Sequence, residues 1–242
     1  MPTGSQTALG IIPARGGSKS VPRKNLCLLG GKPLIAYTIL VAREAKSLDR
    51  VIVSTDDPEI AEAARAYGAE VPFLRPAEIA GDDTPDLPVF QHALGVLWET
   101  ERYRPDVLVH LRPTQPFRTA REIDEVVELL LHTGADCVKS VRPVTEHPHK
   151  MYRLADDRLV PYSDTEFRRQ VGPDYPRQRL EPLYLSAGVV DAVRREVVEA
   201  GSTEGTQVVA YFADPTRYVN LDTLRDFEAA EALLARLRRT EV

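Results

Sequence analysis

Residues 9–25 read LGIIPARGGSKSVPRKN, and this stretch decides the fold prediction. Its apolar start, residues 9–13, is typical of a short buried strand, and residues 14–25 form a loop rich in Gly, Arg and Lys. In a parallel sheet, ligands bind beyond the carboxyl ends of the strands, which is where this loop must lie. Adjacent glycines let backbone N–H groups approach an anion closely, and the cationic side chains add positive charge. The loop therefore suits a polyphosphate, although a solvated basic loop between two elements is the simpler alternative.

An alternation of strand and helix continues through the first 141 residues. The strands are predicted at 51–55, 71–74, 106–111 and 137–141, and the helices at 33–48, 58–67, 88–101 and 119–132. Asp57 is expected to cap the second helix, and Thr119 with Glu122 to form a capping box on the fourth. Because this rhythm is typical of parallel strands joined by right-handed crossovers, we expect a three-layer, Rossmann-like α/β domain with a mostly parallel sheet.

Residues 143–190 interrupt the rhythm. Residues 143–181 of this stretch are rich in Pro, Tyr, Arg and charge, and their periodicity is weak. We therefore expect one domain over 1–242 with an inserted, projecting arm at about 143–190 that acts as a lid, a dimer contact or both. Regular structure is predicted to return with a strand at 184–190, a helix at 193–200, a strand at 208–212 and an amphipathic helix at 224–238.

The composition excludes several classes of protein. The chain has 242 residues, 43% hydrophobic and 28% charged, which is an ordinary globular composition and unlike collagen or a disordered chain. A net charge of -5 without a long basic run argues against nucleic-acid binding. No apolar stretch approaches the roughly 20 residues needed to cross a bilayer, so no membrane partner is expected. Cys27 and Cys137 lack CxxC spacing, which argues against a zinc ribbon and favours a reducing cytoplasm.

Ordered motifs along nearly the whole chain resemble those of one enzyme family. They are IIPARGGSK at 11–19, PRKN at 22–25, GKPL at 31–34, VSTD at 53–56, RPAEIA at 75–80, RPTQPFR at 112–118, EHPHK at 146–150, PRQ at 176–178 and NLDT at 220–223. The set is similar to the cytidylyltransferases that activate acidic sugars, namely the acylneuraminate enzymes and their pseudaminic and legionaminic acid relatives. The resemblance implies a nucleotidyltransferase that moves CMP from CTP to a sugar hydroxyl and releases pyrophosphate. It also implies Mg²⁺ as cofactor and a homodimer.

The resemblance assigns roles on the nucleotide side. Arg15 and Lys24 would hold the triphosphate and, with Asp222, form the catalytic set, because fixed cations stabilise the charge on departing pyrophosphate. Asn25 and Arg75 match positions that read the cytosine. Two simpler alternatives stay open, in which Lys24 is a surface lysine and Arg75 pairs with Glu78. The full nucleotide-binding set implied by the resemblance is Ala14, Arg15, Gly16, Gly17, Ser18, Lys24, Asn25 and Arg75.

The metal site is expected at Asn220 and Asp222. Alternate positions on an extended segment point the same way, so their oxygens can converge. Magnesium prefers hard oxygen ligands and takes the rest of its shell from water and phosphates. Both positions are usually Asp in the family, so Asn220 removes one negative charge. Asp222 is the principal ligand candidate, and its alternative role is to cap the helix at 224–238.

On the acceptor side, the resemblance assigns substrate binding to Arg112, Thr114, Lys150 and Arg177. Lys150 and Arg177 match positions that face the carboxylate of the acidic sugar, a suitable pairing of an ammonium with a guanidinium. Alternatively, they are an exposed lysine and an arginine that contacts another subunit. Glu146, His147 and His149 have a spacing that resembles a zinc site, but Pro148 and the family match favour a loop.

Two departures from the family pattern concern the acceptor. Relatives often have Gln at the position of Arg112 and Pro-Asn-Gly at the position of residues 186–188, which here read SAG. Arg112 would suit an acceptor with an additional or differently placed anionic group. Other acceptors stay open: a 3-deoxy-octulosonate, a phosphonate or a sugar phosphate, with cytidylyl or guanylyl transfer. The alternative from another class is a non-catalytic nucleotide-binding regulatory protein, for which Asn220 is the clue.

Overall fold

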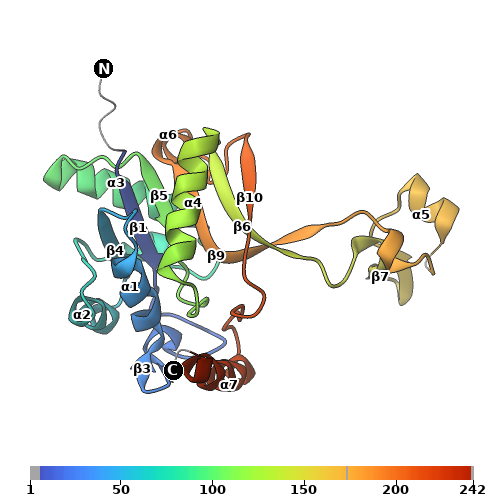
Figure 1. Ribbon diagram of the computed structural model, residues 1–242, viewed down its shortest axis with the longest axis horizontal. Helices are drawn as coiled ribbons and strands as arrows, with labels where there is room; N and C mark the ends of the chain where they lie inside the picture. The colour runs from blue at the N-terminus through green and yellow to red at the C-terminus, as the bar shows by residue number, and fades with distance from the viewer. Residues whose placement is uncertain (1–5, 173, 241–242) are drawn as a thin grey trace. The chain divides into compact units, whose positions relative to one another are not determined.

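The computed structural model describes residues 6–172 and 174–240. Its centre is a six-stranded sheet in the order β10-β6-β9-β5-β1-β4 (Figure 1). β1 pairs in parallel with β4 and β5, whereas β9 runs antiparallel to β5. The predicted α/β fold with a mostly parallel sheet is therefore confirmed, with one antiparallel strand inside it. The strands span β1 Ala8–Pro13, β4 Arg50–Ser54, β5 Val107–His110, β6 Cys137–Pro143, β9 Tyr184–Arg194 and β10 Val208–Phe212.

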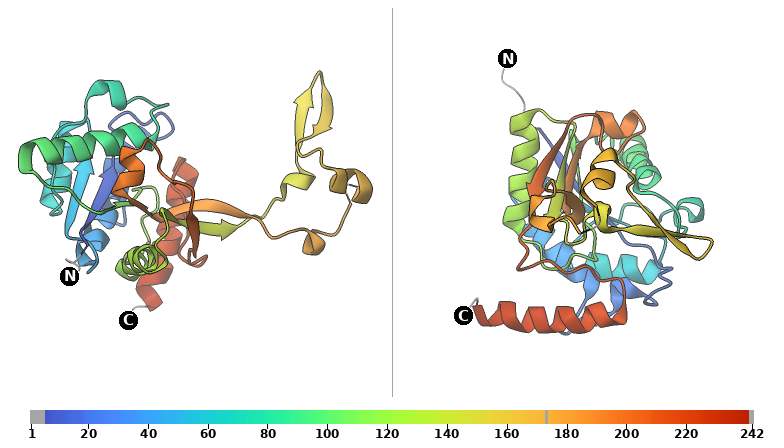
Figure 2. Two further views of the ribbon diagram at one scale, coloured as in Figure 1. Left: turned by 90° about the horizontal axis from the view of Figure 1, so that it is seen from above. Right: turned by 90° about the vertical axis from the view of Figure 1, so that its right-hand side faces the viewer.

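Helices cover both faces of the sheet, as the right-hand view of Figure 2 shows. One face packs against α1 (Leu34–Glu44), α2 (Pro58–Ala66) and α4 (Ala120–Thr133), and the other against α3 (Asp86–Glu101) and α6 (Arg195–Glu199). The alternation of side chains along β1 builds both layers, since Ala8 and Ile12 join the first core and Leu9 and Ile11 the second. The three-layer prediction is thus confirmed.

Local end signals place several helices as predicted. The Asp57 carboxylate accepts hydrogen bonds from the N–H groups of Glu59 and Ile60, and so caps α2. Thr119 and Glu122 form the expected capping box at the start of α4, and Gly134 ends that helix with φ +70°. These contacts satisfy N–H groups that the first turn of a helix leaves without partners.

The predicted strand at 71–74 is wrong. Only Glu70 bridges to the sheet: its N–H donates to Val51 O, and its carbonyl accepts from Val53 N–H. Pro72 has no N–H with which to continue a ladder. Two helix ends also differ, because α1 stops at Glu44 and α6 starts only at Arg195.

Residues 141–186 form a second compact unit, called unit 2, and the rest of the described chain forms unit 1. Unit 2 contains a hairpin of β7 (Tyr152–Ala155) and β8 (Arg158–Pro161), the helix α5 (Glu166–Val171) and the short 3₁₀ turns η3 (Pro148–Lys150) and η4 (Arg177–Arg179). Asp156 and Asp157 both have positive φ, as the two-residue turn of a type I′ hairpin requires. Within the described part of unit 2, only His147, Arg168 and Leu180 are buried.

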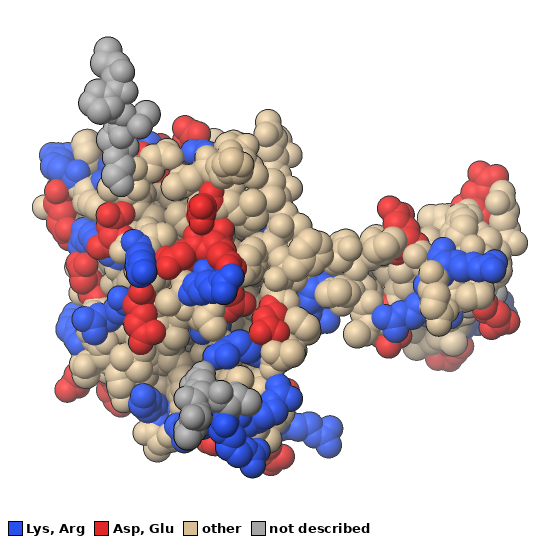
Figure 3. All heavy atoms as spheres, viewed as in Figure 1, with Lys and Arg blue, Asp and Glu red and all other residues tan. Residues whose placement is uncertain are grey.

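The last helix, α7 (Leu224–Thr240), packs on a small hairpin of β2 (Leu28–Leu29) and β3 (Lys32–Pro33). Their shared core contains Leu29, Leu221 and Leu234. Figure 3 shows Lys and Arg side chains gathered around the end of α7, where a cation is favourable next to the negative end of the helix dipole. Through this packing, the segment before α7 is fixed against the loop after β1.

No helix in residues 6–172 and 174–240 has the length and apolar character to cross a bilayer.

Candidate active site

A cavity of about 590 Å³ lies in unit 1, lined in part by residues that follow β1 and β5. This is the edge of the sheet at which ligands of open α/β folds bind. Ala14, Gly16, Gly17 and Asn220 are not among the lining residues. The predicted site residues that line it are Arg15, Ser18, Lys24, Asn25, Arg75, Arg112, Thr114 and Asp222.

In this cavity, Lys24 contacts the segment that precedes α7. Its Nζ donates to the carbonyl of Leu221 over 2.8 Å and lies 3.1 Å from Asp222 Oδ1. The side chain is only 12% exposed, so the alternative of a surface lysine is wrong. Arg23, the preceding residue, has φ +54° and pairs with Asp57 and Glu59 at the start of α2. The loop after β1 therefore faces the acid near the end of the chain.

The segment 220–222 is extended around a buried centre. Leu221 is fully buried and its N–H donates to the carbonyl of Thr114 over 3.0 Å, while Asn220 and Asp222 are exposed. The Asn220 amide donates to Asp222 Oδ2, and its Oδ1 accepts from Gln115 Nε2. The two side chains therefore contact each other, but the Asn220 oxygen faces Gln115, so the expected convergence of both oxygens on a metal stays a prediction.

Asp222 does not cap α7, so that alternative is wrong. The carboxylate of Asp226 accepts instead from the N–H groups of Asp222 and Thr223 and from the Thr223 hydroxyl. These hydrogen bonds lower the pKa of Asp226. The carboxylate of Asp222 is left facing Lys24, Asn220 and the cavity.

The donor set here fits a magnesium ion that is bound mostly by its substrate. Among the described residues, no group of three or more His, Cys, Asp or Glu side chains could hold a metal by itself. Asp222 is 59% exposed, so its oxygens can reach an ion in the cavity. Magnesium commonly binds one or two protein carboxylates and completes its shell with phosphate oxygens and water.

Asp82, which the sequence did not point to, forms ion pairs with two cations of the loop after β1. Asp82 Oδ1 lies 2.8 Å from Arg15 Nη2, and its other oxygen pairs with Lys19. Arg15 also donates to the carbonyl of Gly81 over 2.7 Å. The hydrogen bond from Lys19 is the main cause that lowers the pKa of Asp82. One carboxylate therefore forms ion pairs with two cations of the loop that was predicted to bind a polyphosphate.

The glycines of this loop have different surroundings. The Gly16 N–H donates to Asp56 Oδ1 over 2.9 Å, and a Cβ at Gly16 would lie 2.7 Å from the carboxylate of Asp57. Gly17 has no atoms within 4 Å of such a position. The Ser18 N–H donates to the Gly16 carbonyl over 3.2 Å. Close approach to Asp57 requires Gly16, and the predicted backbone cradle for phosphate stays a prediction.

Asn25 and Arg75 are held by the ends of β1 and β4. Asn25 Nδ2 donates to the carbonyl of Arg15 over 3.1 Å. Arg75 is 7% exposed and donates to both the hydroxyl and the carbonyl of Ser54, and its burial lowers the pKa of the guanidinium. Ser54 is thus its partner, and the proposed ion pair with Glu78 is wrong. A buried guanidinium and an amide at the cavity wall can match the edge of a base.

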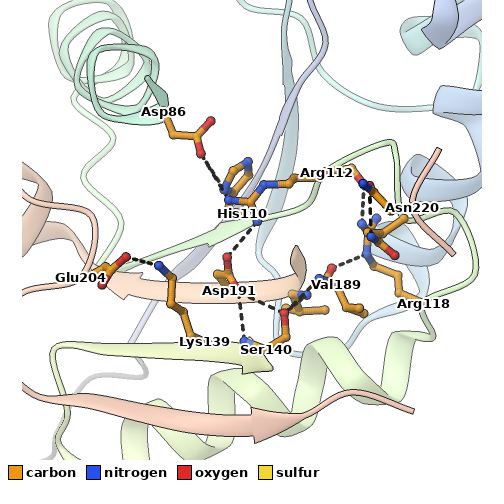
Figure 4. A network of polar contacts seen from close by, with 12 residues as sticks. Asp86, His110, Arg112, Arg118, Lys139, Ser140, Val189, Asp191, Glu204 and Asn220 are labelled. Carbon is orange, nitrogen blue, oxygen red and sulfur yellow. Dashed lines mark hydrogen bonds and ion pairs between the residues drawn. The ribbon is translucent and has the colours of Figure 1, made fainter. Parts of the chain in front are cut away.

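Arg112 lies between two carboxylates (Figure 4). Its Nη1 is 2.8 Å from Asp191 Oδ2, and its Nη2 is 3.2 Å from Asp86 Oδ2. Gly188 has φ +66°, and a Cβ there would lie 3.2 Å from Arg112 Nη1. Arg112 is therefore an ion-paired group, and the backbone of Gly188 lies close beside it. The buried Arg118 donates to the carbonyls of Arg112 and Val189, which holds this wall in place.

Lys150 and Arg177 belong to unit 2, so their predicted contact with the acceptor carboxylate stays a prediction. Lys150 is exposed at the end of η3, and Arg177 donates to the carbonyl of Val144 over 3.1 Å. His147 Nδ1 accepts from the His149 N–H, and its Nε2 lies 3.2 Å from the carbonyl of Glu181. Both nitrogens of His147 are thus engaged by backbone, as the loop interpretation expects.

The fold and this cavity define an α/β protein with a charged site at the carboxyl edge of its sheet, and sequence comparison narrows the class. The cytidylyltransferase family profile matches residues 9–236, so the chain belongs to that family. It is 32% identical over 222 residues to the CMP-N,N'-diacetyllegionaminic acid synthase of Legionella pneumophila, covering 90% of this chain and 88% of that protein. It is 31% identical over 235 residues to the N-acylneuraminate cytidylyltransferase of Escherichia coli O18:K1:H7, covering 97% of this chain and 54% of that protein. The chain thus spans about half the length of the second relative.

Among solved structures, CMP:2-keto-3-deoxy-manno-octonic acid synthetase complexed with CTP superposes with a TM-score of 0.67. The superposition covers 96% of this chain and 99% of that one, at 19% sequence identity. At this level of identity, the likeness supports the fold of the chain.

Proposed function

We propose that this chain transfers CMP from CTP to the hydroxyl of an acidic, nonulosonic-acid-like sugar and releases pyrophosphate. The observation that carries the proposal is the meeting of Lys24 with Asp222 in one cavity with Arg15. A cationic loop and an exposed carboxylate are the two parts that a metal-nucleotide substrate needs. Membership of the cytidylyltransferase family and the names of the relatives support the same reaction.

In the proposed reaction, the acceptor hydroxyl attacks the α-phosphorus of CTP in line with the leaving pyrophosphate. Arg15 and Lys24 hold the triphosphate and stabilise the charge that builds on the leaving group. Asn25 and Arg75 orient the cytosine, Thr114 and Arg112 lie on the acceptor side, and no covalent protein intermediate is required. Asp222 would hold Mg²⁺ in this site, with Asn220 as a second ligand once its amide oxygen is released from Gln115, and the ion would supply charge neutralisation at the phosphates.

The direct test is a release assay for pyrophosphate with four nucleoside triphosphates and a set of anionic acceptors. We expect turnover with CTP, Mg²⁺ and a nonulosonic acid, and little with ATP, GTP or UTP. Turnover with a 3-deoxy-octulosonate, a phosphonate or a sugar phosphate alone would instead assign a different acceptor. Thermal stabilisation by CTP without product would favour the regulatory nucleotide-binding protein.

Asp82 should compete with the triphosphate for Arg15 and Lys19. We expect Asp82→Asn to lower the KM for CTP by a few-fold, because an exposed ion pair is weak and its loss frees both cations. The low pKa of Asp82 means that this competition persists throughout the neutral range. Glu62→Gln, at an exposed residue of α2 that does not line the cavity, is the control and should leave the KM unchanged. A KM for CTP that rises in Asp82→Asn would contradict the competition.

We propose a homodimer formed through unit 2. Its described residues bury few apolar side chains, whereas Leu154 is 70% exposed, Leu159 68% and Tyr162 68%. Leu154 and Leu159 are opposite each other in the hairpin and make one apolar patch. A unit of this size has too little core to be stable alone, and a second copy would bury that patch.

The double variant Leu154→Lys/Leu159→Lys should sediment as a monomer at micromolar concentration, where the unaltered chain sediments as a dimer. Each lysine would place a charge in the proposed contact, where desolvation is unfavourable. Leu28→Lys, at a residue of unit 1 that is 65% exposed, is the matched control and should stay dimeric. A dimer that survives the double change would exclude the hairpin as the interface.

We further propose a cytoplasmic location. Cys27 and Cys137 are both free thiols in the structure, as a reducing compartment favours. The proposed reaction uses a nucleoside triphosphate, CTP, and this substrate is consistent with the same compartment. Activity recovered in a membrane-free cytosolic fraction, and its absence from secreted fractions, would test the location.

A further inference from the structure

A second cavity of about 320 Å³ adjoins the nucleotide cavity. The two share Asp86, His110 and Arg112 in their walls, so they meet at the residues that the sequence analysis associated with the acceptor. The second cavity extends from there to Lys139 and Glu204. A space of this volume can hold a substituent of several heavy atoms.

The charge of this second cavity is negative. Its walls carry the carboxylates of Asp86, Asp191 and Glu204 against the cations Arg112 and Lys139. Both cations are already paired, since Arg112 lies between Asp86 and Asp191 and Lys139 pairs with Glu204 (Figure 4). An anion placed here would meet no uncompensated positive charge. The expectation of an additional anionic group on the acceptor rested on such a charge at Arg112.

The three carboxylates differ in their burial and in how many hydrogen bonds and ion pairs they already make. Asp191 is buried, and its Oδ1 accepts from the N–H and the hydroxyl of Ser140 while its Oδ2 faces Arg112. The side chains of Asp86 and Glu204 are 42% and 47% exposed. Asp191 therefore fixes the wall, and Asp86 and Glu204 are the carboxylates that can accept hydrogen bonds from a ligand.

His110 adds an acceptor without a partner. It is 4% exposed, and its Nε2 is buried with no hydrogen-bond partner. Its Nδ1 lies 3.6 Å from Asp86 Oδ2, and the Phe90 ring packs edge-on against the imidazole. Burial lowers the pKa of His110 well below its usual value, so the ring is neutral at neutral pH. A proton on Nδ1, facing Asp86, leaves Nε2 as an acceptor that requires a donor.

We infer that the second cavity receives the end of the acceptor remote from its reacting hydroxyl, and there selects hydroxyl, amide or amino groups over anionic ones. This inference rests on the proposed CMP transfer to an acidic sugar. It also orients the acceptor, because the sugar carboxylate must point away from Asp86 and Glu204. The specificity-determining residues are then Asp86, His110 and Glu204, with Arg112 as the positioning residue that joins the two cavities.

The test uses two nonulosonic acids that are identical except for the end of one N-acyl substituent, a carboxamide in one and a carboxylate in the other. The two ends have nearly the same shape and differ in charge and in donor capacity. Binding of each to the CTP-loaded protein is measured by calorimetry, which reports the preference even without turnover, and pyrophosphate release is measured in parallel. We expect the carboxamide to bind about tenfold more tightly or better.

Glu204→Gln should reduce this preference several-fold, chiefly by improving the binding of the carboxylate, and Asp86→Asn should act in the same direction. Glu204 lines only the second cavity of these two, so its variant should leave the KM for CTP unchanged. Glu199→Gln is the matched control, because Glu199 is 40% exposed, pairs with Arg104 and Arg195, and lines a different groove.

Equal binding of the two sugars, preference for the carboxylate, or binding of neither would overturn the inference. An unchanged preference in both Glu204→Gln and Asp86→Asn would overturn it as well. A failure of the proposed function would give a different result. The protein would then release no pyrophosphate from CTP with either sugar, while the difference in binding between the two sugars could still be measured by calorimetry.

Discussion

Lys24→Met should lower kcat/KM for CTP by about 100- to 1000-fold, the usual loss when a fixed electrostatic donor to a developing charge is removed. Lys24 is the least exposed of the four cations in the loop after β1, it pairs with Asp222, and the carbonyl of Leu221 holds it there. Methionine keeps the length and the apolar stem of the side chain, so the charge is the main change. Steady-state rates of pyrophosphate release, measured over a range of CTP concentrations, give the ratio.

The matched control for this variant is Lys32→Met. Lys32 is an exposed lysine of β3, on the hairpin that follows the same loop. Its activity should stay within about twofold of the unaltered chain, since an exposed charge contributes little. If Lys24→Met retains most of the activity while its melting temperature is unchanged, the loop after β1 does not hold the triphosphate.

Asp222→Asn should reduce activity by about 100- to 1000-fold at low Mg²⁺, because a metal ion contributes several kcal/mol of charge stabilisation. The substitution keeps the shape of the side chain and removes a carboxylate that faces both Lys24 and the cavity. Excess Mg²⁺ should restore part of the rate, since the phosphates still bind the ion. A titration of the initial rate against Mg²⁺ concentration measures both effects.

Two further substitutions distinguish an effect on metal binding from an effect on the stability of α7. Asn220→Asp restores a second negative charge beside Asp222 and should lower the Mg²⁺ concentration required for half-maximal rate. Asp226→Asn should instead cost about 1 kcal/mol of stability, because it weakens the cap of α7, and leave the Mg²⁺ dependence unchanged. An Asp222→Asn variant with an unaltered Mg²⁺ titration would exclude Asp222 as the metal ligand.

Local sequence signals predicted the elements that depend on local physics. Asp57, Thr119 and Glu122 satisfy the free N–H groups of their own helices, so their roles follow from spacing alone. The strand at 71–74 failed because Pro72 removes a donor just where the sheet ends, a fact that apolar character does not reveal. Local composition likewise indicated that residues 143–190 are exceptional, and the structure separates residues 141–186 as a second unit.

Charge compensation could not be predicted from the same signals. Asp82 is only one of several acids in a polar loop, and its position on Arg15 depends on how that loop folds back over the cavity. From the sequence alone, the charge of Arg112 suggested a binding site for an anionic group, because its neighbours in space were not known. Asp86 and Asp191 lie far from it in sequence, and they change its role from a free cation to a paired one.

The sequence by itself determined the alternating α/β fold, the cationic loop after the first strand and the family to which its motifs point, because each follows from periodicity or from short contiguous patterns. Only the tertiary structure decided that Lys24 meets Asp222 across 198 positions, that Asp226 rather than Asp222 caps the last helix, and that the charge of Arg112 is already balanced. The physical reason is the same in each case. The strength of a charge or a hydrogen bond depends on distance and burial, and both are set by segments that come together only when the chain folds.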